Sequence, residues 1–263
     1  MKMKNYSGLI KLLALLILFI IALIITIIST WILDILIALN LTFAFLILIA
    51  AYRTKKAADF PLLPTLLVLS IVLSLAVNIS STRLILAKGA IFDGCLINFI
   101  SHLVNGLGFI RLITCFTIFI VINLLQIVII IKRVSRVTQV TSQFNHDAIS
   151  KRNMAIDAEY SAGTITITET KAKKNDICNE KDFYEALNGT CKFLFGYEKI
   201  RLLIIILSIF GGILIGTIIQ ENTIIEAVRI YIPLAIGNGL FPMLPPILLS
   251  FAIVKVSRFD TQA

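Results

Sequence analysis

Six long apolar runs constrain this chain more than any other feature. An α-helix needs about 20 mostly apolar residues to cross the roughly 30 Å of hydrocarbon in a bilayer, and each run is close to that length. The pattern therefore predicts an all-α fold, a polytopic helical membrane protein with about six transmembrane helices. The runs cover residues 12–31, 32–52, 62–80, 110–131, 202–219 and 232–254.

The composition supports the same class. Hydrophobic residues make up 58 % of the chain and charged residues 15 %, whereas soluble domains average roughly 45–50 % and about 25 %. These values exclude an ordinary soluble domain. Membrane lipid is thus the first partner that the sequence predicts.

Lys and Arg gather at alternate ends of the apolar runs. Short cytoplasmic loops of membrane proteins are enriched in these two residues, so their distribution predicts orientation. It places both termini and the long segment between the fourth and fifth runs in the cytoplasm. The basic residues at the predicted cytoplasmic ends, apart from the long segment, are Lys2, Lys4, Lys11, Arg53, Lys55, Lys56, Lys255 and Arg258.

A polar segment, residues 132–201, separates the two sets of runs and holds half of the 24 Lys and Arg residues. The predicted organisation is residues 1–131 with transmembrane helices one to four, 132–201 as a cytoplasmic loop subdomain, and 202–263 with helices five and six and a short cytoplasmic tail. The net charge is +9. Because the basic residues lie at span ends and among acidic ones, attraction to anionic lipid explains this charge and no nucleic-acid partner is predicted.

Periodicity predicts local structure outside the spans. Residues 91–107 are amphipathic at helical spacing and predict an interfacial helix. Residues 134–144 predict a helical extension of the fourth span, and residues 181–195 a further helix. The alternation of Thr and Ile over residues 164–168 predicts a short strand. The expected result is a small helical subdomain with a flexible middle.

The cysteines and histidines show no metal-ligand spacing, so no metal or other cofactor is predicted. The sequence also lacks a recognisable nucleophile with a base or a phosphate-binding glycine loop, which argues against an enzyme. The four cysteines are Cys95, Cys115, Cys178 and Cys191, and the two histidines are His102 and His146.

Polar residues within the apolar runs are costly in lipid unless they face other helices or water. Candidate residues of a gate or packing site are therefore Asp34, Asn40, Asn78 and the string Gly237, Asn238 and Gly239. Prolines follow that string, so the last span is predicted to break both at the glycines and at the prolines, as in a pore or gate. No span is predicted to hold a central charge. The small residues Gly211, Gly212 and Gly216 predict close helix packing in the fifth run.

Several strings together resemble one family. Residues 64–67 lead into residues 75–83, which end at Arg83, and residues 154–159 read Met-Ala-Ile-Asp-Ala-Glu. Further matching strings, in the same order, are at 33–35, 147–148, 182–184, 192–193, 211–216, 236–240 and 248–250. This order over most of the chain resembles the FHIPEP family, large inner-membrane components of the flagellar and virulence-associated type III protein export gate.

The resemblance implies a homo-oligomeric ring in the bacterial inner membrane that works with other export-gate membrane proteins. It would help to move unfolded protein substrates across that membrane, coupled to the proton motive force. The family's important Asp corresponds to Asp157. The expected coupling site is Asp157 near Lys151 and Arg152, with Asp147 and Lys192 close by.

Two departures leave alternatives open. The resemblance implies Arg where this chain has Ser74, and Asp where it has Asn238. The family also continues with two further spans and a ring-forming cytoplasmic domain, so substrate docking is not assigned to residues 1–263. The alternatives are a small proton or ion channel or transporter, and a truncated, non-functional copy of the gate component.

Overall fold

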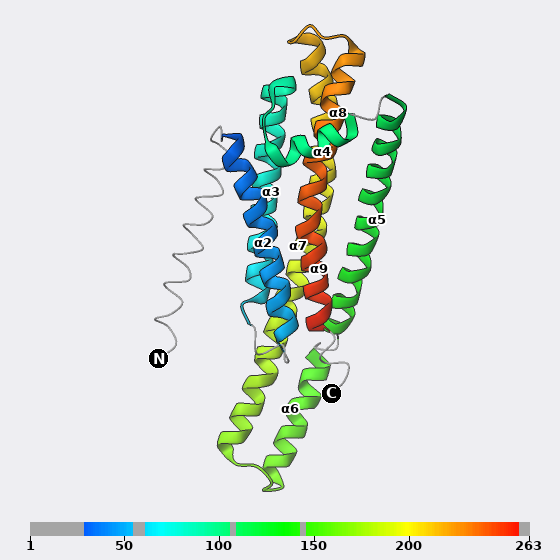
Figure 1. The fold of residues 1–263 in the computed structure, drawn as a ribbon. Coiled ribbons are helices and arrows are strands. Elements are labelled where there is room, and N and C mark those ends of the chain that lie inside the picture. The colour runs from blue at the N-terminus through cyan, green and yellow to red at the C-terminus, as the bar shows by residue number, and fades with distance from the viewer. Residues whose placement is uncertain (1–28, 55–60, 106–108, 143–145, 258–263) are drawn as a thin grey trace. The chain divides into compact units, whose positions relative to one another are not determined.

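The computed structural model describes residues 29–54, 61–105, 109–142 and 146–257 (Figure 1). Every regular element among them is helical, and five segments are long and apolar enough to cross a membrane. The all-α, multi-pass prediction is confirmed. The first predicted span, residues 12–31, lies almost entirely outside the described residues. The five segments are Thr30–Arg53, Leu63–Ile91, Leu112–Arg133, Ile167–Ile218 and Ile224–Val256.

The chain divides into two compact units, and several long helices contribute to both. Unit 1 comprises Met1–Phe43, Ser70–Leu125 and Tyr197–Pro245. Unit 2 comprises Ala44–Leu69, Gln126–Gly196 and Pro246–Ala263. Each unit is described separately below. The division at residues 131 and 201 inferred from the sequence stays a prediction.

Unit 1 contains two clusters of buried apolar residues, and four helices contribute to the larger one. These are α2 (Thr30–Arg53), α3 (Leu63–Lys88), α4 (Cys95–Asn105) and α8 (Ile224–Leu240). Burial of apolar side chains is the main stabilising term wherever such helices exclude water. The buried core residues are Leu33, Leu36, Ile37, Leu73, Val77, Leu84, Ile85, Phe92, Ile97, Ala227, Tyr231 and Leu234.

The short helix α4 crosses α3 and α8 instead of running along them (Figure 1). It follows the one-turn helix η2 (Gly89–Ile91). Ile97 and Val104 are buried, whereas Phe99 and Leu103 are exposed although they are apolar. The Asp34 carboxylate accepts hydrogen bonds from the backbone N–H groups of Cys95 at 2.7 Å and Leu96 at 3.2 Å. A carboxylate there satisfies unpaired donors and complements the positive end of the helix dipole. The helix predicted near residues 91–107 is confirmed.

The last span is interrupted once. Thr223 and Glu226 form a capping box at the start of α8, which satisfies two free N–H groups. The one-turn helix η3 (Phe241–Met243), which contains Pro242, separates α8 from α9 (Leu244–Ser257). Proline lacks an N–H donor, so it interrupts the α-helical hydrogen bonds there. The predicted second break, at Gly237 to Gly239, is wrong, because α8 continues through those residues to Leu240.

Unit 2 contains a hairpin of two antiparallel helices, which lie side by side in Figure 1. The first is α6 (His146–Ser161), and the second is residues 167–196 of α7 (Ile167–Ile218). We call these two segments the α6–α7 hairpin. Gly163 lies in the connecting turn with φ of +72°, a backbone conformation that glycine adopts without strain.

The strand predicted for residues 164–168 is wrong, because α7 begins at Ile167. Glu169 accepts a hydrogen bond from the Thr166 N–H at 2.8 Å, and the Glu169 N–H donates to the Thr166 hydroxyl at 3.3 Å. This reciprocal pair is a capping box and fixes a helix start. The predicted helix at residues 181–195 is confirmed as part of α7. Helix α5 (Phe109–Ser142) likewise confirms the helical extension of the fourth span.

Candidate functional site

The candidate coupling residue Asp157 lies on the α6–α7 hairpin and is paired across it. Its Oδ1 is 2.6 Å from Lys174 Nζ, and Glu159 Oε2 is 2.6 Å from Lys173 Nζ. All four side chains are exposed. The hairpin therefore holds two adjacent carboxylate–ammonium pairs in water, where a proton can reach either carboxylate.

The other charged candidates of the polar segment are distributed along α6 and α7. Arg152 pairs with Glu180, with 3.6 Å between Nη1 and Oε2, and Lys151 is exposed on α6. Lys192 follows Lys174 by 18 residues on α7, or ~27 Å of helix rise. Asp147 is the second residue of α6, ~15 Å of rise from Asp157, and its side chain lies outside the described part. Lys192 therefore does not lie beside Asp157, and the proximity of Asp147 to Asp157 stays a prediction.

In unit 1, α3 carries a buried stripe of small polar side chains. Ser70, Ser74, Asn78 and Ser81 recur at three- or four-residue spacing, so they share one helix face, and all four are buried. The Asn40 amide of α2 donates to Ser74 Oγ at 2.7 Å, and Ser74 Oγ donates to the Ser70 carbonyl at 2.9 Å. Asn40 therefore joins α2 to α3 by a neutral hydrogen bond.

Asn238 of α8 makes the second such connection. Ser81 Oγ donates to its Oδ1 at 2.5 Å, and its Nδ2 donates to Thr82 Oγ1 at 2.9 Å. Both halves of the amide are therefore satisfied by α3. Asn78, one turn before Thr82, has no exposed surface. Arg83, the last residue of the stripe region, is half-buried.

The sequence analysis missed a buried ion pair. Glu198 and Arg201 of α7 are both fully buried. Glu198 Oε2 is 2.9 Å from Arg201 Nη2 and accepts a hydrogen bond from Arg201 Nε at 3.0 Å. Arg201 Nη1 also donates to the Gly239 carbonyl at 3.4 Å. The pair lies just before the fifth apolar run, residues 202–219, so it does not test the prediction that no span holds a central charge. The signal was the three-residue spacing just before an apolar run, which places both charges on one face.

Tyr197 precedes this pair and contacts the interrupted span. Its hydroxyl donates to the Pro242 carbonyl at 3.5 Å. That carbonyl has no α-helical donor four residues later, because residue 246 is a proline. Tyr197 and Arg201, one helical turn apart on α7, thus donate to one carbonyl within the break, that of Pro242, and to one just before it, that of Gly239. Side chains of a neighbouring helix stabilise irregular backbone at membrane depth in this way.

The candidate packing glycines allow close approach of helices. A Cβ on Gly212 would overlap the Tyr231 ring, and one on Gly216 would lie 2.9 Å from it. A Cβ on Gly237 would lie 2.6 Å from the Ile97 carbonyl, and one on Gly239 would overlap Phe119. Gly211 is different, because its Cβ would meet Leu86 at an ordinary 3.6 Å. Among the three glycines of the fifth run, Gly212 and Gly216 therefore form the face that packs tightly.

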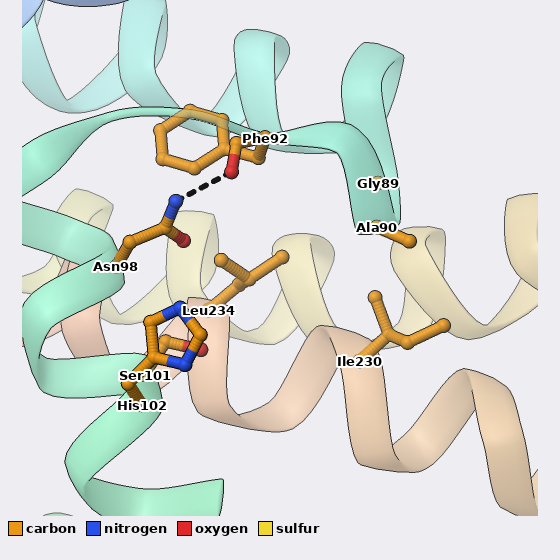
Figure 2. A pocket seen from close by; sticks show the side chains of 8 residues that line it. All are labelled: Gly89, Ala90, Phe92, Asn98, Ser101, His102, Ile230 and Leu234. Atoms are coloured by element: carbon orange, nitrogen blue, oxygen red, sulfur yellow. Dashed lines mark hydrogen bonds between the residues drawn. The ribbon is translucent and has the colours of Figure 1, made fainter.

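A small cavity of about 160 Å³ opens between η2, α4 and α8 (Figure 2). Figure 2 shows Asn98, Ser101 and His102 of α4 on one side and Ile230 and Leu234 of α8 on another. The Asn98 amide donates to the Phe92 carbonyl, so part of the polar lining serves the fold. Among the described residues, no group of three or more His, Cys, Asp or Glu side chains is placed to hold a metal ion.

Comparison with known proteins decides the family. The sequence matches the FHIPEP family over residues 20–262. The chain belongs to the FHIPEP family. Curated relatives include the flagellar biosynthesis protein FlhA of Borreliella burgdorferi, 39 % identical over 83 % of this chain, and that of Treponema pallidum, 39 % identical over 85 %. FlhA of Salmonella typhimurium is 33 % identical over 94 % of this chain.

This FHIPEP chain spans about a third of the length of those relatives: 32 % of the Borreliella and Treponema proteins and 36 % of the Salmonella protein. No solved structure matches it significantly. Ser74 and Asn238, where the resemblance implies charged residues, both lie in unit 1 and both accept and donate neutral hydrogen bonds. In this chain, α3 therefore connects to α2 and α8 without formal charges at those positions.

Proposed function

We propose that this chain is part of a type III protein export gate and helps to move unfolded protein across the bacterial inner membrane, coupled to the proton motive force. The observation that carries the proposal is the FHIPEP match over residues 20–262. The relatives named as flagellar biosynthesis proteins favour the flagellar form of the gate. The role is transport, with no catalytic step and no cofactor.

The proposed setting follows from the same match and from the charge distribution. The chain would have both termini in the cytoplasm, and residues 132–201 with it. Its proposed partners are further copies of itself in a ring, other export-gate membrane proteins, exported substrates and membrane lipid. On this arrangement, the α6–α7 hairpin faces the cytoplasm.

The proposed coupling step is protonation of Asp157. A proton on this carboxylate removes its charge and with it the ion pair to Lys174. Such a change shifts a conformational equilibrium only if the two states differ in their interaction with the carboxylate. Here the ion pair holds α6 against α7 in one state, and its loss favours any state in which the two helices separate or slide.

The test is export by a full-length FHIPEP relative that carries residues 132–201 of this chain in place of its own loop. Asp157→Asn is compared with Glu159→Gln in motility and in secretion of a reporter substrate. The second variant is a matched control, because Glu159 has the same 2.6 Å pairing on the same exposed hairpin. We expect a severe export defect for Asp157→Asn and near-normal export for Glu159→Gln.

Equal defects in the two variants would mean that Asp157 only stabilises the hairpin through its ion pair. Undiminished export by Asp157→Asn would refute the coupling role. Glu at position 157 keeps the charge and should restore part of the export. A hybrid protein that does not export even with the unchanged loop would contradict the gate assignment of this loop.

A second candidate is a small proton or ion channel, and the polar features of unit 1 favour it. The buried stripe on α3 and the interrupted span would suit a hydrated path. Purified protein in liposomes distinguishes the two, because a channel conducts without export partners. A proton flux above that of empty vesicles, abolished by Asn238→Leu, would support the channel.

A further inference from the structure

Two contacts between a cation and an aromatic ring join three helices within unit 2. The Arg133 guanidinium of α5 lies over the Phe251 ring of α9, 4.5 Å from its centroid. Lys255 Nζ of α9 lies 5.8 Å from the centroid of the Tyr52 ring of α2. Phe251 and Lys255 are four residues apart, so they share one face of α9, with ~6 Å of helix rise between them. We call these four residues the basic–aromatic cluster.

The helix parts around the cluster carry cations but no acidic residue. They are residues 44–53 of α2, 126–142 of α5 and 246–257 of α9, and none of these ranges contains Asp or Glu. Besides the two cations of the cluster, they carry Arg53 and Lys132, which are both exposed. Like charges gathered in this way repel one another. An anion bound from outside these segments would relieve that repulsion.

The cation–aromatic contacts leave hydrogen-bond donors for such an anion. A guanidinium that lies over a ring uses its face, whereas its N–H groups point outward in its plane and can bind two phosphate oxygens at once. The ammonium of Lys255 has three donors of its own. The rings do not enclose the cations, because Phe251 is 41 % exposed and Tyr52 is 58 % exposed. A phosphate therefore fits this open face, since charge-assisted bonds from both cations can reach its oxygens.

The depth of the cluster favours the phosphate of a lipid over a dissolved one. Arg133 is the last residue of the apolar segment Leu112–Arg133, and Tyr52 lies at the end of Thr30–Arg53. Tyrosine is enriched at this depth, where the lipid headgroups lie. Ile129, one turn before Arg133 on the same face of α5, is 41 % exposed. It offers an apolar surface to an acyl chain directly beside the guanidinium.

We propose that the basic–aromatic cluster binds one anionic phospholipid, with Arg133 and Lys255 donating to the oxygens of its headgroup phosphate. The acyl chain beside Arg133 contacts α5 at Ile129. Basic pockets between membrane helices on the cytoplasmic side bind anionic headgroups in this way. The inference rests on the cytoplasmic placement in the proposed function, and it assigns a site and a chemistry to the lipid partner named there.

Lipid binding to the purified chain tests the proposal. The protein in detergent is titrated with phosphatidylglycerol or with phosphatidylcholine of the same acyl chains, and native mass spectrometry counts the lipid retained per chain. We expect one phosphatidylglycerol per chain at concentrations at which phosphatidylcholine is not retained. Phosphatidylglycerol should also raise the thermal midpoint, because a ligand that binds the folded state stabilises it. Equal retention of the two lipids would overturn the proposal.

Arg133→Gln and Lys132→Gln are a matched pair of variants. Each removes one positive charge from the same depth of α5, but Arg133 is the one that lies over Phe251. A cation near a membrane surface changes the binding of anionic lipid by about fivefold. We expect Arg133→Gln to weaken phosphatidylglycerol binding by about that factor or more, and Lys132→Gln by about twofold or less. Thermal midpoints without lipid check that both variants fold.

Two further variants separate the charge from the geometry. Arg133→Lys keeps the charge and loses the planar fork, so its affinity should lie between that of the unchanged chain and that of Arg133→Gln. Phe251→Leu keeps an apolar contact but removes the ring beneath the guanidinium, and it should also weaken binding. An affinity unchanged by Phe251→Leu would contradict the role of the ring in the site.

Equal losses in Arg133→Gln and Lys132→Gln would show diffuse attraction to basic helix ends and would reject a defined lipid site. That result would leave the export-gate proposal standing, because binding is measured without export partners. Failure of the export test with selective lipid binding intact would have the opposite meaning.

Discussion

The α6–α7 hairpin and the polar cluster of unit 1 use polar side chains in opposite ways. The hairpin pairs full charges in exposed positions, as in Asp157 with Lys174. The cluster in unit 1 uses neutral partners, such as Asn40 with Ser74, and its ion pair of Glu198 with Arg201 is fully buried. The distances between paired atoms are similar in the two regions, but the exposure of the paired side chains differs.

The surroundings decide how much each interaction contributes. A charge pair in water is screened, and exposed pairs contribute about 0–1 kcal/mol. In a low-dielectric interior, the same attraction is much stronger, but each charge also loses its hydration. The charged side chains of the hairpin can therefore exchange ion-pair partners at little cost in free energy. Removing one member of the Glu198–Arg201 pair instead leaves a buried charge without its ion-pair partner. Regions that must move suit the first arrangement, and regions that must keep one geometry suit the second.

The largest expected effect comes from breaking the buried pair on one side. Arg201→Met removes the guanidinium that pairs with the buried Glu198 carboxylate, and it removes the contact to the Gly239 carbonyl. We expect a loss of about 3–5 kcal/mol, measured as a lower thermal midpoint in detergent and a lower yield of folded protein. Glu198→Gln combined with Arg201→Met should recover most of that loss, because no charge stays buried. A double variant as unstable as the single one would contradict this account.

A smaller effect is expected from adding one methyl group to α7. Gly212→Ala places a Cβ against the Tyr231 ring, and overpacking of this kind costs about 1–3 kcal/mol. Gly211→Ala is the matched control, because its Cβ meets Leu86 at 3.6 Å and Ala favours a helix over Gly by up to about 1 kcal/mol. Thermal unfolding should therefore rank the unchanged chain between the two variants. A higher thermal midpoint for Gly212→Ala than for Gly211→Ala would show that α8 can move away from α7 to accept the added methyl group.

Removing an ion pair from the α6–α7 hairpin should lower its stability much less. Lys174→Ala removes the partner of Asp157, and because both side chains are exposed the loss should be below about 1 kcal/mol. Adding 0.5 M salt to the unchanged chain should remove a similar amount, since the Debye length falls to a few ångströms. Hydrogen exchange of α6 amides measures both effects. Salt-insensitive protection would show that apolar contacts, not ion pairs, hold α6.

These two regions also differ in how far the sequence predicted them. The spans and α4 followed from apolar runs and helical periodicity, because lipid and the core select on side-chain polarity alone. The start of α7 was missed because Thr and Ile alternate over residues 164–168, while the deciding signal was the capping residue pair Thr166 and Glu169.

The partners of the charged residues could not be read from the chain. Asp157 pairs with Lys174, 17 residues away, only because the turn at Gly163 folds α7 back along α6. Arg201 was assigned to the polar segment because it ends a run of charges, and its burial depends on α8, nearly 40 residues later. Local patterns specify elements, whereas these contacts depend on how separate elements pack.

The smallest expected effect concerns an exposed carboxylate between η2 and α4. Hydrogen bonds from Lys88 and, next, Thr30 lower the pKa of Asp93 below its ordinary value. A carboxyl whose pKa is lower in the folded state stabilises the fold above its unfolded pKa, and this contribution disappears as pH falls through the folded pKa. The thermal midpoint of the unchanged chain should therefore exceed that of Asp93→Asn slightly at pH 6. The gap should close as the solution is acidified past the ordinary range of an aspartate. Thr30 belongs to α2 and Lys88 to α3, so a gap that persists in acid would mean that packing, not charge, joins these helices at Asp93.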